Sequence, residues 1–112
     1  MEADTHQESF GSYLKSFRMK REMTVEAISH QTKIAVHCLR AIEESAHEEL
    51  PPRAYVKSFL RTYADAVGAD PDVAVQCYMA DLAIQASTER QLRKRQEKVR
   101  ALQRFLLTLG LI

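Results

Sequence analysis

The amino-acid sequence predicts an all-α fold, with five helices packed in one compact domain and a basic helical extension after it. Three glycines and three prolines in 112 residues are too few for a turn-rich β architecture. Apolar residues recur at helical spacing, and residues that start or stop helices separate these stretches. We expect a disordered N-terminus over residues 1–8, a helical domain over 9–86 and the extension over 87–112.

Three short helices are expected in the first half of the chain. The first covers residues 9–22, where an apolar face alternates with lysines and arginines. Thr24 is a suitable N-cap for the second, which runs to about His30, and the third follows over residues 35–44. The residues that form the inner faces of the first and third helices are Phe10, Tyr13, Leu14, Phe17, Val36, Leu39 and Ile42.

Two further helices follow a loop that is rich in glutamate. Pro51 and Pro52 suit the first turn of the fourth helix, which is expected to end at Gly68. Asp70 and Pro71 form a cap and a first-turn proline for the fifth helix. The break at residues 86–88 is weak, so the basic extension is either a separate helix or a continuation of the fifth.

The second and third helices have the pattern of a helix-turn-helix unit between Thr24 and Ser45. Such a unit needs a small residue where its helices meet, a turn residue that tolerates positive φ, and apolar residues inside the second helix. Ser29 and Lys33 occupy the first two positions, and Leu39 and Ile42 occupy the inner face. A lysine in place of the usual glycine costs on the order of 1 kcal/mol.

Several local motifs resemble one family of this class. They are Phe10-Gly11-Ser12-Tyr13-Leu14, Met23-Thr24-Val25-Glu26-Ala27-Ile28, Thr32-Lys33-Ile34, Leu39-Arg40-Ala41-Ile42-Glu43-Glu44, Leu50-Pro51 and Tyr55-Val56-Lys57-Ser58-Phe59-Leu60-Arg61-Thr62-Tyr63-Ala64. Together they resemble the cytoplasmic helix-turn-helix domain of the bacterial cell-shape RodZ family, a branch of the Xre/Cro repressor superfamily. The resemblance covers roughly residues 9–78, and the turn and the aromatic helix separate this branch from ordinary repressors.

The resemblance implies a protein-interaction adaptor that docks on the actin-like filament MreB. It also implies a chain that continues into one transmembrane segment, with the domain in the cytoplasm at the inner face of the inner membrane. In the family pattern, Tyr55 and Phe59 are expected to touch the filament. Ser58 departs from the glycine common in the family, which would alter how closely this helix approaches its partner.

The residues themselves leave two readings of the fourth helix open. Tyr55, Phe59 and Tyr63 form an aromatic row beside the basic residues Arg53, Lys57 and Arg61, a composition typical of interfaces. The same rings would equally suit the core face. We expect one buried ring and two that are partly exposed. The predicted filament-binding residues are Arg53, Tyr55, Lys57, Phe59 and Tyr63.

Sequence-specific DNA binding of the Xre/Cro type is the alternative function. The positions that would face DNA are Val25, Ala35, Val36, His37 and Arg40, of which only the last two can donate a side-chain hydrogen bond. Residues 1–87 carry 9 basic and 13 acidic residues, and Glu43, Glu44, Glu48 and Glu49 would repel phosphate. Charge and readout chemistry therefore favour the adaptor. The candidate DNA-binding residues are Lys20, Arg21, Lys33, His37 and Arg40.

The extension is strongly basic over residues 90–104 and apolar over 105–112. A basic segment that leads into an apolar run is typical of the cytoplasmic side of a transmembrane helix, which needs about 20 residues. This pattern predicts a juxtamembrane helix that leads into a truncated span. Alternatively, Leu92, Val99, Leu102, Leu106 and Leu109, interrupted by Arg95, suggest a helix that pairs with itself, lies on anionic lipid or folds back on the domain.

Other functions find little support in the sequence. His6, His30, His37 and His47 lack ligand spacing, so no metal is expected, and they are predicted to lie at the surface. Cys38 and Cys77 are predicted to be reduced and buried. No phosphate-binding loop or activated nucleophile is recognisable, so we expect neither an enzyme nor a cofactor. The polar start of the chain does not indicate secretion.

Overall fold

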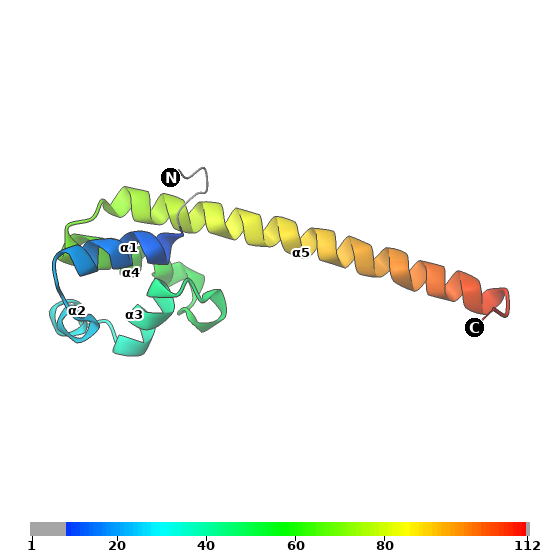
Figure 1. Cartoon of the computed structure of the whole chain (residues 1–112), viewed down its shortest axis with the longest axis horizontal. Helices are drawn as coiled ribbons and strands as arrows, with labels where there is room; N and C mark the ends of the chain where they lie inside the picture. The colour runs from blue at the N-terminus through cyan, green and yellow to red at the C-terminus, as the bar shows by residue number, and fades with distance from the viewer. Residues whose placement is uncertain (1–8, 112) are drawn as a thin grey trace. The chain divides into compact units, whose positions relative to one another are not determined.

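The computed structural model describes residues 9–111 and confirms the all-α prediction (Figure 1). The predicted disorder of residues 1–8 lies outside the described residues. In the part described, the elements are α1 (Phe10–Lys20), α2 (Val25–Thr32), α3 (Val36–Glu43), the 3-10 turn η1 (His47–Glu49), α4 (Arg53–Val67) and α5 (Pro71–Thr108). The weak break at residues 86–88 does not end α5, so the extension continues the fifth helix.

The chain divides into two compact units, Met1–Asp81 and Leu82–Ile112. The division falls within α5, five residues before the boundary that the sequence analysis places after residue 86. The first unit holds the helix-turn-helix and the buried core. The second unit contains the rest of α5.

The starts of α2 and α5 follow the predicted caps, Thr24 and Asp70, and Ser9 is a further cap that the sequence analysis does not name. The side chains of Ser9 and Thr24 accept hydrogen bonds from the backbone N–H groups of Ser12 and Ala27, at 3.2 and 3.0 Å. Asp70 Oδ1 accepts one from the backbone of Asp72 at 2.9 Å. The two prolines before α4 behave differently from the prediction, because Pro52 is the N-cap and both precede the first helical turn.

The turn between α2 and α3 confirms the helix-turn-helix prediction. Lys33 adopts the left-handed conformation, with φ 65° and ψ 18°, and its N–H donates to the carbonyl of Ser29 at 2.8 Å. Ser29 Oγ donates to the carbonyl of Ile34 at 2.6 Å. Thr32 Oγ1 donates to the carbonyl of Ile28 at 2.7 Å. The short polar side chains thus satisfy backbone groups that a tight turn leaves without helical partners.

The core lies between α1, α2, α3, α4 and the start of α5, and its side chains come from all five helices. Gly11 lets α1 approach α3 closely, because a Cβ there would lie 2.3 Å from the carbonyl oxygen of Ile42. The N–H of Gly11 also donates to Ser45 Oγ at 3.2 Å. The largest fully buried side chains are Tyr63, Tyr78, Phe10, Leu14, Ile28, Leu39, Ile42, Leu60, Val56 and Val67.

Candidate functional site: the α4 surface and the helix-turn-helix face

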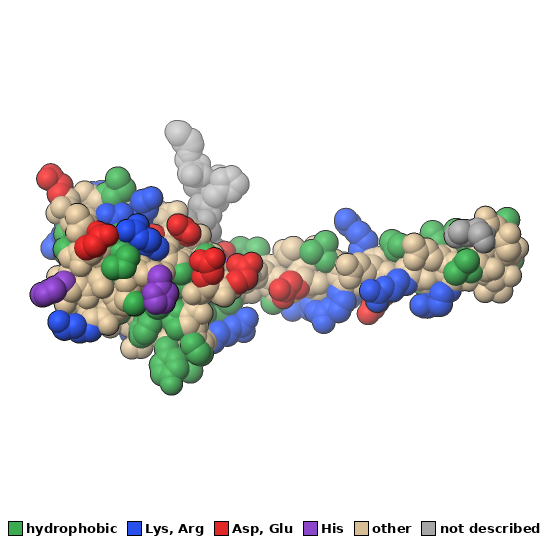
Figure 2. Space-filling model, turned by 90° about the horizontal axis from the view of Figure 1, so that it is seen from below, with side chains coloured by type: hydrophobic (Ala, Val, Ile, Leu, Met, Phe, Trp, Pro, Cys, Tyr) green, Lys and Arg blue, Asp and Glu red, His purple; other side chains and the backbone are tan. Residues whose placement is uncertain are grey.

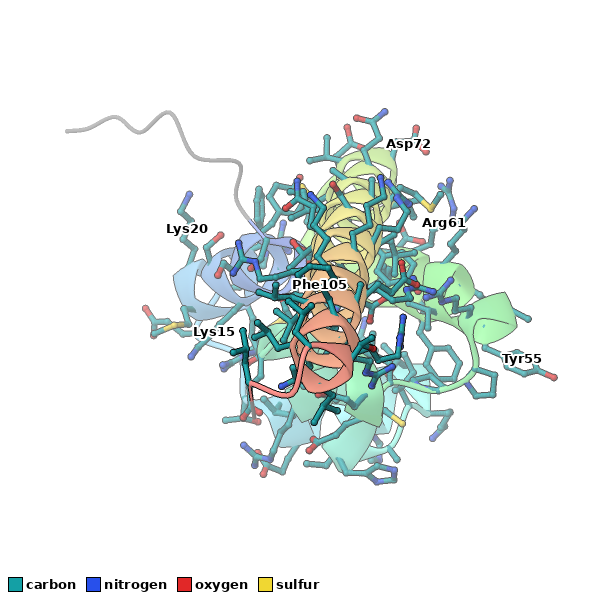
Figure 3. All side chains as sticks on the ribbon, turned by 90° about the vertical axis from the view of Figure 1, so that its right-hand side faces the viewer. Lys15, Lys20, Tyr55, Arg61, Asp72 and Phe105 are labelled. Atoms are coloured by element: carbon teal, nitrogen blue, oxygen red, sulfur yellow. The ribbon has the colours of Figure 1, made fainter. Side chains whose placement is uncertain are left out.

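The first turns of α4 present an aromatic and basic surface, which we call the α4 surface. Tyr55 has 58% of its area exposed and points away from the body of the domain (Figure 3). Phe59, one helical turn later, is half-buried. Arg53 and Lys57 are also exposed, but each is two residues from Tyr55 and lies roughly 160° around the helix axis from it, on the other flank of α4. The α4 surface therefore has an aromatic flank, Tyr55 and Phe59, and a basic flank, Arg53 and Lys57.

Tyr63 does not belong to the α4 surface, although it continues the aromatic row in the sequence. Residues four apart on an α-helix drift by roughly 40°, so Tyr63 lies roughly 80° around the axis from Tyr55. This rotation places Tyr63 in the core, where it has no exposed area. One buried ring and two partly exposed rings match the expectation, but Tyr63 drops out of the proposed filament contacts because no partner can reach it.

Tyr63 instead completes a three-residue network that spans three helices. Arg18 of α1 forms a two-point ion pair with Glu43 of α3, with Nε–Oε2 at 2.6 Å and Nη2–Oε1 at 3.0 Å. The hydroxyl of Tyr63 in α4 donates to the same Oε2. Arg18 Nη1 also donates to the backbone carbonyl of Met23 at 2.8 Å. The network fixes α4, and therefore the α4 surface, against α1 and α3.

Burial gives this network its electrostatic character. The side chains of Arg18 and Glu43 are only 14% and 8% exposed. The hydrogen bond to Glu43 raises the pKa of Arg18 above its usual range. Burial, followed by the hydrogen bond to Glu43, raises the pKa of the Tyr63 hydroxyl well above its ordinary value. Arg18 thus stays charged and Tyr63 stays neutral through the neutral range.

Glu43 is not the solvent-facing, phosphate-repelling acid that its place in the sequence predicts. Its carboxylate is paired with Arg18 and largely buried, so its charge is neutralised locally. The other acids of that stretch, Glu44, Glu48 and Glu49, are exposed as expected. Spacing in the sequence gives no sign of the pairing, because Arg18 lies 25 residues before Glu43.

The helix-turn-helix face exposes three of the candidate DNA-binding residues, namely Lys33, His37 and Arg40. Arg40 Nη2 lies 3.0 Å from Glu26 Oε2 in an ion pair whose members are both more than half exposed. Val25, placed on this face by the sequence analysis, is buried and contributes nothing to it. The exposed face therefore offers a small number of donors, one of which is already paired.

The other two candidates, Lys20 and Arg21, come from the end of α1. Lys20 Nζ lies 5.4 Å above the ring of Phe17, within the range of a cation–π contact. The guanidinium of Arg21 fills the space where a side chain at Gly68 would sit, 2.2 Å from the Cβ position. Arg21 thus packs against the end of α4, although it remains exposed to solvent.

The prediction that all histidines lie at the surface is wrong for His47. Its side chain is 15% exposed, and Nε2 lies 2.8 Å from Asp81 Oδ2. Its ring stacks on Tyr78 at 5.9 Å and meets Phe10 edge-on at 5.4 Å. The contact holds η1 against the first turns of α5 within the first unit.

Cys38 and Cys77 are both reduced, but they are half-buried rather than buried as predicted. Across residues 9–111, no three histidine, cysteine or carboxylate side chains gather in a group that would hold a metal ion.

The fold and these surfaces define a helix-turn-helix domain, a class of binding module. Residues 13–74 match the profile of a family described as a helix-turn-helix domain, and the chain belongs to this family. It is similar to the cytoskeleton protein RodZ of Streptococcus pneumoniae, with 29% identity over 62% of this chain and 25% of that protein. It is also similar to the membrane protein YmfM of Bacillus subtilis, with 33% identity over 54% of this chain and 21% of that protein.

The fold is shared with a solved structure of YmfM from Staphylococcus aureus, a membrane protein for which DNA binding has been proposed. The TM-score is 0.60 at 29% identity, over 65% of this chain and 89% of that one. The chain spans only about a fifth to a quarter of the length of the two curated relatives. The similarity to RodZ is distant and covers 70 residues of this chain.

Proposed function

We propose that this chain is a non-enzymatic adaptor that docks on an actin-like MreB filament and links it to the inner face of the inner membrane. The observation that carries the proposal is the exposure of Tyr55 at the start of α4, with Phe59 one turn later on the same flank and two exposed cations on the other. Tyrosine and arginine are the residues that most often dominate binding energy at protein interfaces. The relationship to a cytoskeleton protein supports the choice of a filament as the partner.

The rigidity of α4 supports docking through this surface. Binding is stronger when the contact residues are held in place beforehand, because less conformational freedom is lost on association. The network of Arg18, Glu43 and Tyr63 anchors the C-terminal half of α4 to two other helices. The domain carries more acidic than basic residues. This charge suits a partner that contacts the α4 cations locally, and it disfavours a polyanion, which would meet the negative charge of the whole unit.

The localisation at the membrane is part of the same proposal. RodZ and YmfM support it as relatives, and the latter is described as a membrane protein. Within the described residues, the structure contains no helix with the length and apolar content needed to cross a bilayer. The proposed link therefore depends on the basic second unit or on a segment outside this sequence.

Co-sedimentation with polymerised MreB tests the proposed docking. Replacing Tyr55 and Phe59 together by alanine is expected to weaken pelleting at least tenfold, because hot-spot aromatics contribute about 2 kcal/mol or more each. Met19→Ala is a matched control, since Met19 on α1 has 59% of its area exposed, like Tyr55. Equal pelleting of wild type and the Tyr55 and Phe59 double variant would remove the α4 surface from the proposal.

DNA binding through the helix-turn-helix face is the second candidate, and one specific observation favours it. Pairing with Arg18 neutralises Glu43, which removes one of the four carboxylates that would oppose phosphate. Lys33, His37 and Arg40 are exposed on that face. Against it, Arg40 is paired with Glu26.

The DNA-binding candidate predicts duplex binding that weakens steeply with salt and on Arg40→Ala or Lys33→Ala. Nanomolar affinity for one sequence at physiological salt would favour this function over the adaptor. Salt-independent or undetectable binding would remove it.

A further inference from the structure

We infer that the amphipathic helix of residues 82–111, here called the tail segment, which is helical as far as Thr108, lies along the surface of an anionic lipid bilayer. This inference deepens the membrane-linking half of the proposed function and rests on it. It concerns a surface of the tail segment alone, and the filament-docking surface on α4 is not involved.

The tail segment exposes an apolar stripe that has no partner among the described residues of its own unit. Its members recur at spacings of seven, three, four and three residues, which places the first four along one side of the helix, and the fifth, Leu109, lies in the turn directly after it. Four of the five have about half of their area exposed, and Leu106 is partly covered. A helix gains most of its stability by packing such a face, so we expect another apolar surface to cover the stripe. The stripe consists of Leu92, Val99, Leu102, Leu106 and Leu109.

The tail segment also carries a strong positive charge. It contains seven lysines and arginines and only two acids, Glu89 and Glu97. Figure 2 shows blue side chains along this stretch with few red ones among them. A row of arginines lies opposite the stripe at spacings of three, seven and four residues, and two lysines lie between the row and the stripe. These residues are Arg90, Arg93, Arg100 and Arg104 in the row and Lys94 and Lys98 at its border.

An anionic bilayer engages both features at once. The stripe can enter the boundary between headgroups and acyl chains, while Lys94 and Lys98 reach the phosphates from the border. The helix is about 10–12 Å across, close to the Debye length of about 8–10 Å, so the opposite arginines also feel the surface potential. Attraction is roughly 1 kcal/mol per cation near such a surface, or about fivefold in partitioning.

A second copy of the tail segment fits the same features less well. In a paired helix, Arg95 would occupy the seam at the position between Leu92 and Val99. Two tail segments side by side would also bring together two stretches of net charge +5. At a bilayer, by contrast, the long stem of Arg95 can lie along apolar surface while its guanidinium reaches the headgroups.

A nucleic acid also fits less well than lipid. The arginine row would suit phosphates, but a polyanion bound there leaves the apolar stripe in water. Lipid is the partner whose chemistry matches the stripe and the cations together. The charge pattern and the apolar stripe thus both favour a lipid surface.

Flotation of the whole 112-residue chain with vesicles tests the inference. Vesicles of phosphatidylglycerol and phosphatidylcholine in equal parts are expected to carry the protein, and vesicles of phosphatidylcholine alone are not. Lys94→Gln with Lys98→Gln is expected to weaken partitioning about 25-fold, at about fivefold per charge. The matched control, Lys15→Gln with Lys20→Gln, removes the same charge from the first unit and is expected to float like wild type.

A second pair of variants tests the stripe. Leu102→Gln with Leu106→Gln is expected to weaken flotation at least about tenfold, because burying a leucine contributes about 1.5–3 kcal/mol. Ala101→Gln with Thr108→Gln changes residues off the stripe and is expected to leave flotation unchanged. Equal loss in both pairs would overturn the assignment of the stripe.

Three further results would overturn the inference. The first is equal flotation with both vesicle types. The second is a lipid-free dimer that does not float and that dissociates when Leu102 and Leu106 are replaced. The third is capture of the protein by duplex DNA in preference to vesicles. Because the assay contains no filament, Tyr55→Ala is expected to float like wild type. Failure of flotation therefore leaves the MreB result standing, and failure of MreB pelleting leaves the flotation result standing.

Discussion

Glu43 of α3 accepts two hydrogen bonds from the guanidinium of Arg18 in α1, at 2.6 and 3.0 Å, within a largely buried pocket. The same carboxylate accepts the hydroxyl of Tyr63 from α4. A single acid therefore joins three helices of the domain. It holds α4, whose first turns carry the proposed interface, and its pairing with Arg18 neutralises a negative charge at the end of α3.

Loss of this carboxylate is expected to destabilise the fold. Glu43→Gln leaves the buried Arg18 without its charge partner and should lower the free energy of unfolding by about 3 kcal/mol. Glu44→Gln is the matched control because Glu44 is the exposed neighbour, and we expect a change within about 0.5 kcal/mol. Urea unfolding followed by circular dichroism measures both. Equal effects would mean that the ion pair does not hold the helices together.

Tyr63 is expected to make stability fall at high pH. Its pKa is raised in the folded state, first by burial and then by the hydrogen bond to Glu43, whereas the unfolded chain titrates near 10.0. The folded state therefore holds this proton more tightly, and its contribution is complete below pH 10.0 and is lost as the pH rises above that value.

Alkaline unfolding and phenolate absorbance check this pH dependence. Tyr63→Phe is expected to show a shallower loss of stability above pH 10.0 than the wild type. The wild type should form the Tyr63 phenolate only as the far-ultraviolet circular dichroism signal is lost. A Tyr63 phenolate signal in a chain that is still fully helical would contradict the assigned environment.

Two glycines are expected to respond very differently to alanine. At Gly11 the new Cβ would meet backbone oxygens of Ile42 and Glu43 at 2.3 and 2.4 Å, which cannot move without separating α1 from α3. At Gly68 the clash is with the flexible end of Arg21, although φ is +77°. We expect a loss of about 3 kcal/mol for Gly11→Ala and about 1 kcal/mol for Gly68→Ala in thermal unfolding. The reverse order would be inconsistent with the close approach of α1 and α3.

The turn at Lys33 offers a stabilising substitution. Lys33 holds φ 65°, a conformation that costs a non-glycine residue on the order of 1 kcal/mol. Lys33→Gly is expected to raise the midpoint of thermal unfolding by a few degrees, and Lys33→Val to lower it, because a β-branched side chain tolerates positive φ poorly. A higher midpoint for the valine variant would contradict the left-handed turn.

Local chemistry explains why so much of the fold can be predicted from the sequence. The side chains of Thr24 and Asp70 accept hydrogen bonds from backbone N–H groups within three residues, so both residues indicate helix starts. Gly68 indicates a helix end because glycine, which has no Cβ, adopts positive φ without strain. Lys33 is recognisable as the turn residue from the spacing of its neighbours. These signals act within a few residues and need no tertiary information.

The remaining contacts join residues that are far apart in the sequence, so no local motif indicates them. The partners of Glu43 lie 25 residues before it and 20 after it, so the acid looks like any solvent-facing glutamate. Tyr63 shares a spacing with Tyr55 and Phe59, yet the helical drift turns it into the core. His47 and Asp81 are 34 residues apart, and they come into contact only because η1 packs against α5.

The central claim is that the α4 surface, and not the helix-turn-helix face, contacts the partner. The most direct measurement places a photo-activated crosslinking side chain at Tyr55 in one variant and at His37 in another, with polymerised MreB and duplex DNA both present. We predict a crosslink to MreB from position 55 and none from position 37. Crosslinking to DNA from position 37, with no MreB adduct from position 55, would contradict the account.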